Sequence, residues 1–317
     1  MQAIAPEIDT KHYAKGVEAS KRISWGIDRD VIRGRSFDFS KKFLPDGLSL
    51  VEELPNLNEQ ERRMLGQIQG RTCANMFGLV ERFIGAKITE LSRDYRRGDQ
   101  TALQALVRFS DDDRKHQELF RRIETMIAEW MPSGYRFLPQ PNEVASVVLQ
   151  KSTWAVLGLT CHIELFTQVH YLQSTEADPN LSELYKDVFL FHWKEESQHA
   201  ILDELEWIRE DAKLTAEERD SAVTDLIELV AAVDGLLQLQ SGADLDYFLT
   251  LCDRGFTTHH IEEIRKVILK AYRWQYIVSG VQDPRFNSIL GRMITSEQGV
   301  RIGKALAPIL DSLRPGA

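Results

Sequence analysis

Four long segments with helical periodicity follow one another in the middle of this chain. Apolar residues recur at three- and four-residue spacing, and the period-2 alternation typical of strands is nearly absent. The segments are predicted to span residues 58–95, 101–131, 141–173 and 181–211, separated by "RRGDQ", "MPSGYRFLPQPN" and "STEADPNLS", whose turn residues stop one helix and cap the next. This pattern predicts an all-α fold built round a four-helix bundle.

The flanking regions are predicted to cover this bundle. Residues 1 to about 57 contain the breakers "FLPDG" and "ELPNLN" and are expected to be irregular and to wrap over the core. Further helices are expected at 215–240, 243–253, 257–277 and 284–312, where they cover one end of the bundle, form an access route or bury a dimer interface. The chain is expected to be a single helical domain over residues 1–317, with its core at 58–211 and additional helices at 212–317.

Composition restricts the partners of this protein. A length of 317 residues with 43% apolar residues suffices for a sizeable core. The net charge of -9, without a basic block, argues against nucleic acid or an anionic membrane and favours a small-molecule ligand. Cys73, Cys161 and Cys252 lack C-x-x-C spacing, which fits a reducing cytoplasm without disulfides. Neither an apolar signal region nor a run of about 20 apolar residues is found, so no exported or membrane-spanning protein is expected.

The stretch "FHWKEESQHA" in the fourth segment carries potential metal ligands. Because each helical residue advances about 100°, His192, Glu196 and His199 share one face. Glu195 points about 100° away from Glu196 and is assigned to a neighbouring surface. Taken alone, this stretch could equally be an amphipathic helix with polar residues placed by chance.

The other three segments supply matching groups. Asp113 and His116 in "DDDRKHQELF" repeat the acid-x-x-His spacing of Glu196 and His199, which lets both side chains reach one cation. Glu81 and Glu164 lie in largely apolar stretches of the first and third segments, where a charge requires compensation.

Hairpin geometry brings these groups to one level. The position midway between Glu81 and Asp113 is 97, inside the first separator, and the position midway between Glu164 and Glu196 is 180, inside the third. Bundle helices pack about 8 to 10 Å apart, so two such hairpins would gather the carboxylates and histidines round a common centre. One acid from each of two helices and an acid-x-x-His pair from each of the others is the ligand set of dinuclear carboxylate bundles, suited to iron or manganese.

With His192 included, the fourth segment reads His-x-x-x-Glu-x-x-His and resembles the AurF-type p-aminobenzoate N-oxygenase family. The resemblance covers residues from about 58 to 211 and implies a ferritin-like fold with a seven-ligand di-iron site formed by Glu81, Asp113, His116, Glu164, His192, Glu196 and His199. Asp113 stands where the family pattern has a glutamate that is expected to bridge the metals. The shorter side chain requires a closer approach of the second helix or a different binding mode.

The resemblance also implies a function. It implies reductive activation of O2 by two iron ions, with manganese or a mixed pair also admitted, and oxygen transfer to an amine or another electron-rich group. An external electron donor, a ferredoxin or a reductase, and a homodimer are expected. The resemblance is specific for the metal site and not for the substrate.

Two other function classes compete with an oxygenase. A ferritin- or rubrerythrin-like protein would oxidise iron or remove peroxide, but the chain lacks a rubredoxin-type cysteine set, and His192 is surplus to such a site. A helical interaction protein with a degenerate site would leave the carboxylates paired with Lys or Arg.

Several further polar residues need an interpretation. His162 faces about 200° away from Glu164 and is predicted not to be a ligand. His259 and His260 are expected to be exposed at a helix start. Asp111 and Asp112 are either partners of the ligands or solvated charges. Large aromatic residues such as Trp154, Trp193, Trp274, Tyr272 and Tyr276 are expected to pack.

Overall fold

A computed structural model describes residues 10–314 of the protein. Within this range the chain forms helices and a single isolated bridge between Lys42 and Leu181, without a strand. The all-α prediction is therefore confirmed. The expectations made for residues 1–9, which concern the start of the wrap and part of the proposed absence of a signal region, lie outside the described residues.

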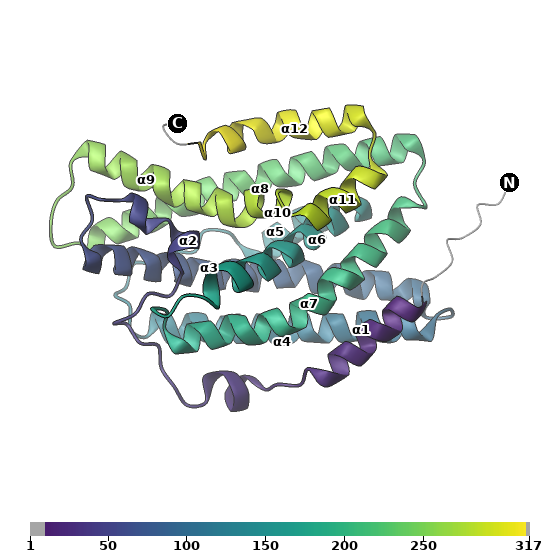
Figure 1. Cartoon of the computed structure of the whole chain (residues 1–317), viewed down its shortest axis with the longest axis horizontal. Coiled ribbons are helices and arrows are strands. Elements are labelled where there is room, and N and C mark those ends of the chain that lie inside the picture. The colour runs from purple at the N-terminus through teal and green to yellow at the C-terminus, as the bar shows by residue number, and fades with distance from the viewer. Residues whose placement is uncertain (1–9, 315–317) are drawn as a thin grey trace.

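Two helix hairpins form the centre of the molecule. The first pairs α3 (Glu59–Ser92) with α4 (Gln100–Ala128), and the second pairs α6 (Thr153–His170) with α7 (Glu183–Asp211) (Figure 1). The first turn is a 3-10 turn, η3 (Arg93–Tyr95), and the second begins with a π turn, η4 (Tyr171–Thr175). The four-helix core predicted from the sequence is confirmed in this arrangement.

Side-chain caps set where the first hairpin begins and turns. Asn58 and Glu61 form a capping box at the start of α3, each side chain bonding the other's backbone N–H. Asp99 accepts from the backbone N–H groups of Thr101 and Ala102 at the start of α4. The Asp99 cap fixes where the turn ends and α4 begins, and the turn fixes which residues of the two helices lie level.

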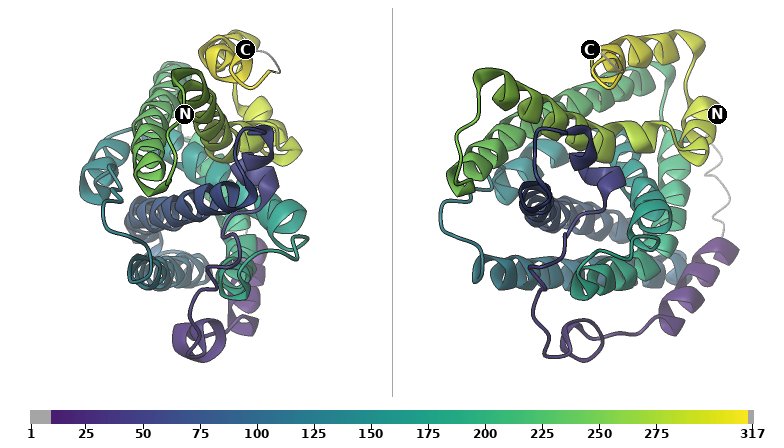
Figure 2. Two further views of the ribbon diagram at one scale, coloured as in Figure 1. Left: turned by 90° about the vertical axis from the view of Figure 1, so that its left-hand side faces the viewer. Right: turned by 60° about the vertical axis from the view of Figure 1, so that its left-hand side comes forward.

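The N-terminal segment is more regular than predicted. It contains α1 (Thr10–Arg22), a π-helical turn η1 (Ile27–Ile32), α2 (Asp46–Ser49) and η2 (Val51–Glu53). Tyr13, Gly16 and Val17 are buried at helical spacing, a pattern that the prediction of an irregular segment missed. The Tyr13 hydroxyl donates to Glu206 Oε1 of α7 at 2.5 Å. Helix α1 lies on the side of the bundle opposite to α8 (Ala216–Leu251) and α12 (Ser296–Asp311) (Figures 1 and 2).

Two predicted helices are each divided in the structure. Residues 141–173 form α5 (Pro141–Leu149) and α6, because the Ser152 backbone N–H and the Lys151 ammonium both donate to Asp225 of α8. Residues 284–312 form α11 (Pro284–Met293) and α12 (Ser296–Asp311), because Thr295 and Gln298 form a capping box that starts a new helix.

Conversely, the break predicted at "QSGAD" is wrong. Helix α8 runs without interruption over Ala216–Leu251. Gln240 and Asp244 are fully buried and bonded to each other, and Asp244 also accepts from Thr72 of α3 and Tyr272 of α9 (Thr258–Arg273). These tertiary contacts hold Gly242 in helical geometry, although glycine favours other conformations.

Helices α8 and α9 pack over one side of the bundle, and α9 continues through a π turn, η5 (Trp274–Val278), into α10 (Ser279–Val281). In the described part of the chain, every helix is too short or too polar to cross a lipid bilayer.

The N-terminal segment crosses α3 closely at Gly70, which gives the first testable prediction. A Cβ atom at Gly70 would lie 2.6 Å from Phe43 Cβ, so Gly70→Ala is expected to displace Phe43 and lower the free energy of unfolding by about 1 to 3 kcal/mol. The control is Gly78→Ala on the same helix, where the new Cβ would meet Phe120 Cβ at an ordinary 3.4 Å and should change stability by less than about 1 kcal/mol. Urea denaturation measures both, and equal effects would contradict the close crossing.

Candidate metal centre

The structure brings all the predicted ligands into the middle of the four-helix core. Helix α3 contributes one of them, α4 two, α6 one and α7 three, and every one is at least 98% buried. They are Glu81, Asp113, His116, Glu164, His192, Glu196 and His199. The hairpin geometry predicted for these residues agrees with their positions.

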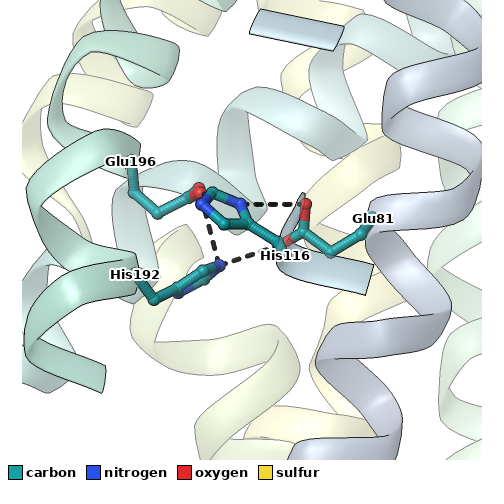
Figure 3. Close-up of side chains that lie close together, drawn as sticks. All are labelled: Glu81, His116, His192 and Glu196. Carbon is teal, nitrogen blue, oxygen red and sulfur yellow. Dashed lines mark hydrogen bonds and ion pairs between the residues drawn. The ribbon is translucent and has the colours of Figure 1, made fainter. Parts of the chain in front are cut away.

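Glu196 lies at the centre of the cluster. Its Oε1 atom is 3.1 Å from Nδ1 of His116, 3.3 Å from Nε2 of His192 and 3.3 Å from Nδ1 of His199. Glu81 of α3 contacts two of these histidines, at 3.4 Å to His116 and 2.9 Å to His192 (Figure 3). Three imidazole nitrogens and two carboxylates thus converge from three helices.

The donor atoms span more than one coordination sphere. Three overlapping groups have ligand atoms within 4.8 Å of one another: Glu81, His116, His192 and Glu196; Asp113, His116 and His199; Glu164, Glu196 and His199. Each group alone has the size of a single site, and shared members join the three. This arrangement fits two adjacent cations better than one.

Asp113 belongs to the cluster, and its neighbour Gly85 explains how. Asp113 is fully buried and its Oδ1 atom is 3.8 Å from His199 Nδ1, whereas Glu118 is half-exposed and paired with Arg121. A Cβ atom at Gly85 of α3 would lie 3.2 Å from both Cβ and Oδ2 of Asp113. The missing side chain at Gly85 therefore lets α4 approach closely at the level where the shorter acid needs it.

Glu195 contacts the cluster from its outer side, which the sequence interpretation did not foresee. It is 1% exposed, and its Oε2 atom lies 2.9 Å from His116 Nε2, the ring nitrogen that faces away from Glu196. Its other oxygen accepts from Lys115 at 2.5 Å. A carboxylate on the outer nitrogen of a ligating histidine fixes the ring and its tautomer. The wheel angle on α7 alone could not reveal this contact, because His116 comes from α4.

The same arrangement recurs more loosely at His199. Its outer Nε2 atom is 3.6 Å from Asp112 Oδ2, whereas Asp111 is largely exposed and paired with Arg114. Asp112 is therefore a partner of a predicted ligand, whereas Asp111 is a solvated charge. Lys115 lies near both outer carboxylates, 3.4 Å from Asp112 and 2.5 Å from Glu195.

Aromatic rings enclose the histidines. Phe109 stacks on His199 with ring centroids 3.9 Å apart, while Phe77 and Phe120 meet the His192 ring edge to face. Trp25, from the N-terminal segment, lies nearly parallel to the His116 ring and receives Lys115 on its face. These rings lower the polarity round the cluster and strengthen electrostatic interactions within it.

The remaining histidines lie away from the cluster. His162 is directed to the opposite side of α6, where its Nε2 atom lies 3.2 Å from the carbonyl oxygen of Tyr276, as predicted for a residue outside the ligand set. His259 is exposed near the start of α9, also as predicted, and His260 is partly buried there.

Without bound metal, protons would compensate the charges of the cluster. Burial raises the pKa of Asp113 and of Glu164 well above the usual range, helped by Glu81 and Glu196 respectively. Burial alone would raise the pKa of Glu196, but His192 and His199 outweigh it and hold that pKa well below its ordinary value. Burial likewise opposes a charge on His116, but Glu81 and its neighbours raise that pKa well above the ordinary value.

Unpaired polar atoms test whether the cluster fits cations. Among the described residues, both oxygens of Asp113, Oε2 of Glu164, Oε1 of Glu196 and both ring nitrogens of His199 are buried without a hydrogen-bond partner. Buried polar atoms are almost always paired, so a group of them at one place needs an explanation. The recorded ion pairs of Glu81, Asp113 and Glu196 are to histidines rather than to Lys or Arg. The residues therefore fit bound metal ions and do not fit a degenerate site.

A scan against models of protein families finds no match. A search of curated proteins also finds none. A search of solved structures finds an R2-like ligand-binding oxidase variant with an aerobically reconstituted Mn/Fe cofactor, which covers 87% of this chain and 96% of its own at 15% identity and a TM-score of 0.42. This likeness is too remote to assign ligands, cofactor or activity, so these depend on the residues of the site itself.

The protonated state of Glu164 leads to a stability prediction for the metal-free protein. An unfolded Glu ionises near pH 4.5, whereas in the folded protein burial keeps Glu164 protonated to higher pH. This difference lowers the free energy of unfolding. The loss is absent below the unfolded pKa and grows as pH rises above it, and Glu164→Gln removes the loss. The variant should therefore gain unfolding free energy relative to wild type from pH 4.5 to pH 8.

Urea denaturation with a chelator present measures this gain at the two pH values. The exposed Glu143→Gln serves as the matched control and should show no such pH-dependent gain. A difference between Glu164→Gln and wild type that does not change with pH would contradict a protonated Glu164.

Proposed function

We propose that this protein is a non-haem di-iron oxygenase that activates O2 to oxygenate a small organic molecule. The observation that carries the proposal is the set of seven buried oxygen and nitrogen donors from four helices, with unpaired atoms at its centre. The recorded ion pairs of its acids are to histidines and not to Lys or Arg. Such a set exceeds the needs of a structural cation.

The donor set favours iron, with manganese or a mixed iron and manganese pair as the alternatives. Four carboxylates, Glu81, Asp113, Glu164 and Glu196, would neutralise most of the charge of two divalent or trivalent ions, and three imidazoles complete a mixed oxygen and nitrogen set. Zinc sites usually have fewer ligands and often include thiolates. The three cysteines of this chain do not belong to any of the donor groups.

The residues of this chain hold and shield the metals. Two reduced ions, when bound, would supply electrons and open positions for activation of O2. Glu195 and Asp112 orient His116 and His199 from outside, and Lys115 offsets the charge of these two acids. Phe77, Phe109 and Phe120 exclude water from the histidine side of the cluster.

The finer proposal is N-oxygenation of an arylamine. It rests on the resemblance of the His192, Glu196 and His199 pattern to the AurF-type family, supported by His192 lying 2.9 Å from Glu81 inside the cluster rather than at its edge. An external donor, a ferredoxin or reductase, would resupply electrons. A homodimer in the cytoplasm remains part of the proposal.

Metal titration and product analysis test this function together. Anaerobic titration with Fe(II) should saturate at about two ions per chain, and O2 addition should then convert an arylamine to an oxygenated product detected by mass spectrometry. A single tightly held zinc would contradict the dinuclear site. Repeated Fe(II) oxidation that deposits mineral, without product, would instead identify the ferroxidase alternative.

Substitutions on α7 separate the roles of the ligands. Glu196→Ala is expected to abolish most iron loading, because Glu196 faces three histidines, whereas His192→Ala should retain much of the loading and change the rate of reaction with O2. Metal analysis and stopped-flow absorbance measure these two effects. Equal and negligible effects would show that this face of α7 is not the site.

Glu195 provides a prediction that depends on the structure alone. Glu195→Gln leaves the shape unchanged but removes the charge that orients His116, and it should weaken iron affinity by roughly 10- to 100-fold. Glu210→Gln, on the same helix and with a recorded ion pair to Lys213, is the matched control and should leave the affinity unchanged. Identical iron affinities of both variants would contradict the orienting role of Glu195.

A further inference from the structure

A cavity lies outside the four-helix core, apart from the candidate metal centre. It is partly open to solvent, has a volume of about 620 Å³ and lies between α6, α8, η5, α11 and α12. Its size is within the range of small-molecule sites in proteins, which is roughly 300 to 1,000 Å³. None of the seven proposed metal ligands lines it, although α6 contributes both Glu164 to the cluster and His162 to the cavity. The two sites therefore lie on opposite faces of one helix.

Helix α12 forms the outer wall of the cavity and is anchored near both of its ends. Near its start, Gln298 and Arg301 both bond the Asp220 carboxylate of α8, at 3.1 and 3.0 Å, and near its end Ile309 is buried. Between these anchors, Ile302 and Leu306 are only partly buried and line the cavity. An apolar helix face normally buries itself against its neighbours, so this face has room for an occupant.

The cavity wall is apolar and lacks a cationic side chain. Its lining contains Leu, Ile, Val, Phe and Ala residues from all the enclosing elements but no Lys or Arg. Its one acid, Asp234, is neutralised by Arg273, whose Nε and Nη2 atoms lie 2.7 and 2.9 Å from the carboxylate. Burial lowers the pKa of His162 to about 4, so this side chain is neutral at pH 7. The wall offers nothing to balance a charged ligand.

We infer that this cavity binds an uncharged lipophilic molecule, independently of the metal centre. An apolar pocket of this size holds ordered water poorly, because water needs polar partners, and a lipophilic ligand would bury the apolar surface of its walls. An anionic lipid would lack a counter-ion, and a cationic one would have to compete with Arg273 for Asp234. The inference goes beyond the proposed oxygenase function and does not depend on it.

Two glycines permit a test that fills the cavity without straining the fold. Gly291 of α11 and Gly303 of α12 line the cavity, and a Cβ atom added at either would meet no heavy atom within 4 Å. Both are helical positions at which leucine is a better helix former than glycine. Gly235 of α8 is equally open but does not line the cavity, so Gly235→Leu is the matched control.

Binding of Nile red, a neutral fluorescent probe, to the full chain measures occupancy. Wild type and Gly235→Leu should bind it equally, whereas Gly291→Leu and Gly303→Leu should each bind about tenfold more weakly, because the leucine side chain displaces one or two methylene-sized groups of ligand. Below its micellar concentration, 1-dodecanol should displace the probe better than dodecanoate or dodecylamine. Circular dichroism and thermal melting confirm that the variants fold.

Three outcomes would overturn the inference. These are equal probe binding by all three leucine variants, displacement by dodecanoate or dodecylamine as good as by the alcohol, and a dimer that binds no probe because a second copy covers α12. Chelated and iron-loaded protein should bind the probe equally. A failure of the metal centre, seen in iron titration, thus leaves this test unaffected.

Discussion

Mutual compensation among buried charges is the constraint on which this structure depends. Seven ionisable groups lie in the middle of a helical bundle, where an unpaired charge would cost several kcal/mol. In the metal-free protein the compensation comes from protons and from histidines, with Glu196 facing three imidazoles. Metal ions would replace those protons, so loading should release acid and strengthen with rising pH. The Asp99 cap and the hairpin turns keep these groups at one level, and the aromatic rings round the histidines lower the polarity there.

The gathering of these seven residues was predictable because it depends on local spacing. The offsets within α4 and α7 follow from helix geometry, and the level of Glu81 against Asp113 follows from the length of one turn. Glu195 and Gly85 were not predictable in this way, since each acts on a residue of another helix. Gly85 also resolves how an aspartate fits where the resembling family has a glutamate, because α3 has no side chain opposite it.

The errors in helix boundaries have a common physical origin. Local turn residues suggested a break at Gly242, but buried hydrogen bonds of Gln240 and Asp244 keep α8 intact. Helix α6 begins later in the sequence than predicted, because Asp225, distant in sequence, accepts a hydrogen bond from the backbone N–H of Ser152. Tertiary partners decided both cases, and a single sequence does not show which partners will meet. The missed capping box at Thr295 was, by contrast, visible in the sequence.

The contacts of the N-terminal segment set an order for assembly. Tyr13 bonds Glu206, 193 residues later, and Arg35 bonds Asp187. Trp25 stacks against His116 and packs at a tilt against Phe191. The N-terminal segment therefore docks only after α7 has been synthesised, because its partners on α7 do not exist before then. Until it docks, the outer side of His116 lacks the Trp25 ring that covers it. At the proposed metal centre, this side of His116 would therefore stay accessible to metal ions until the N-terminal segment docks.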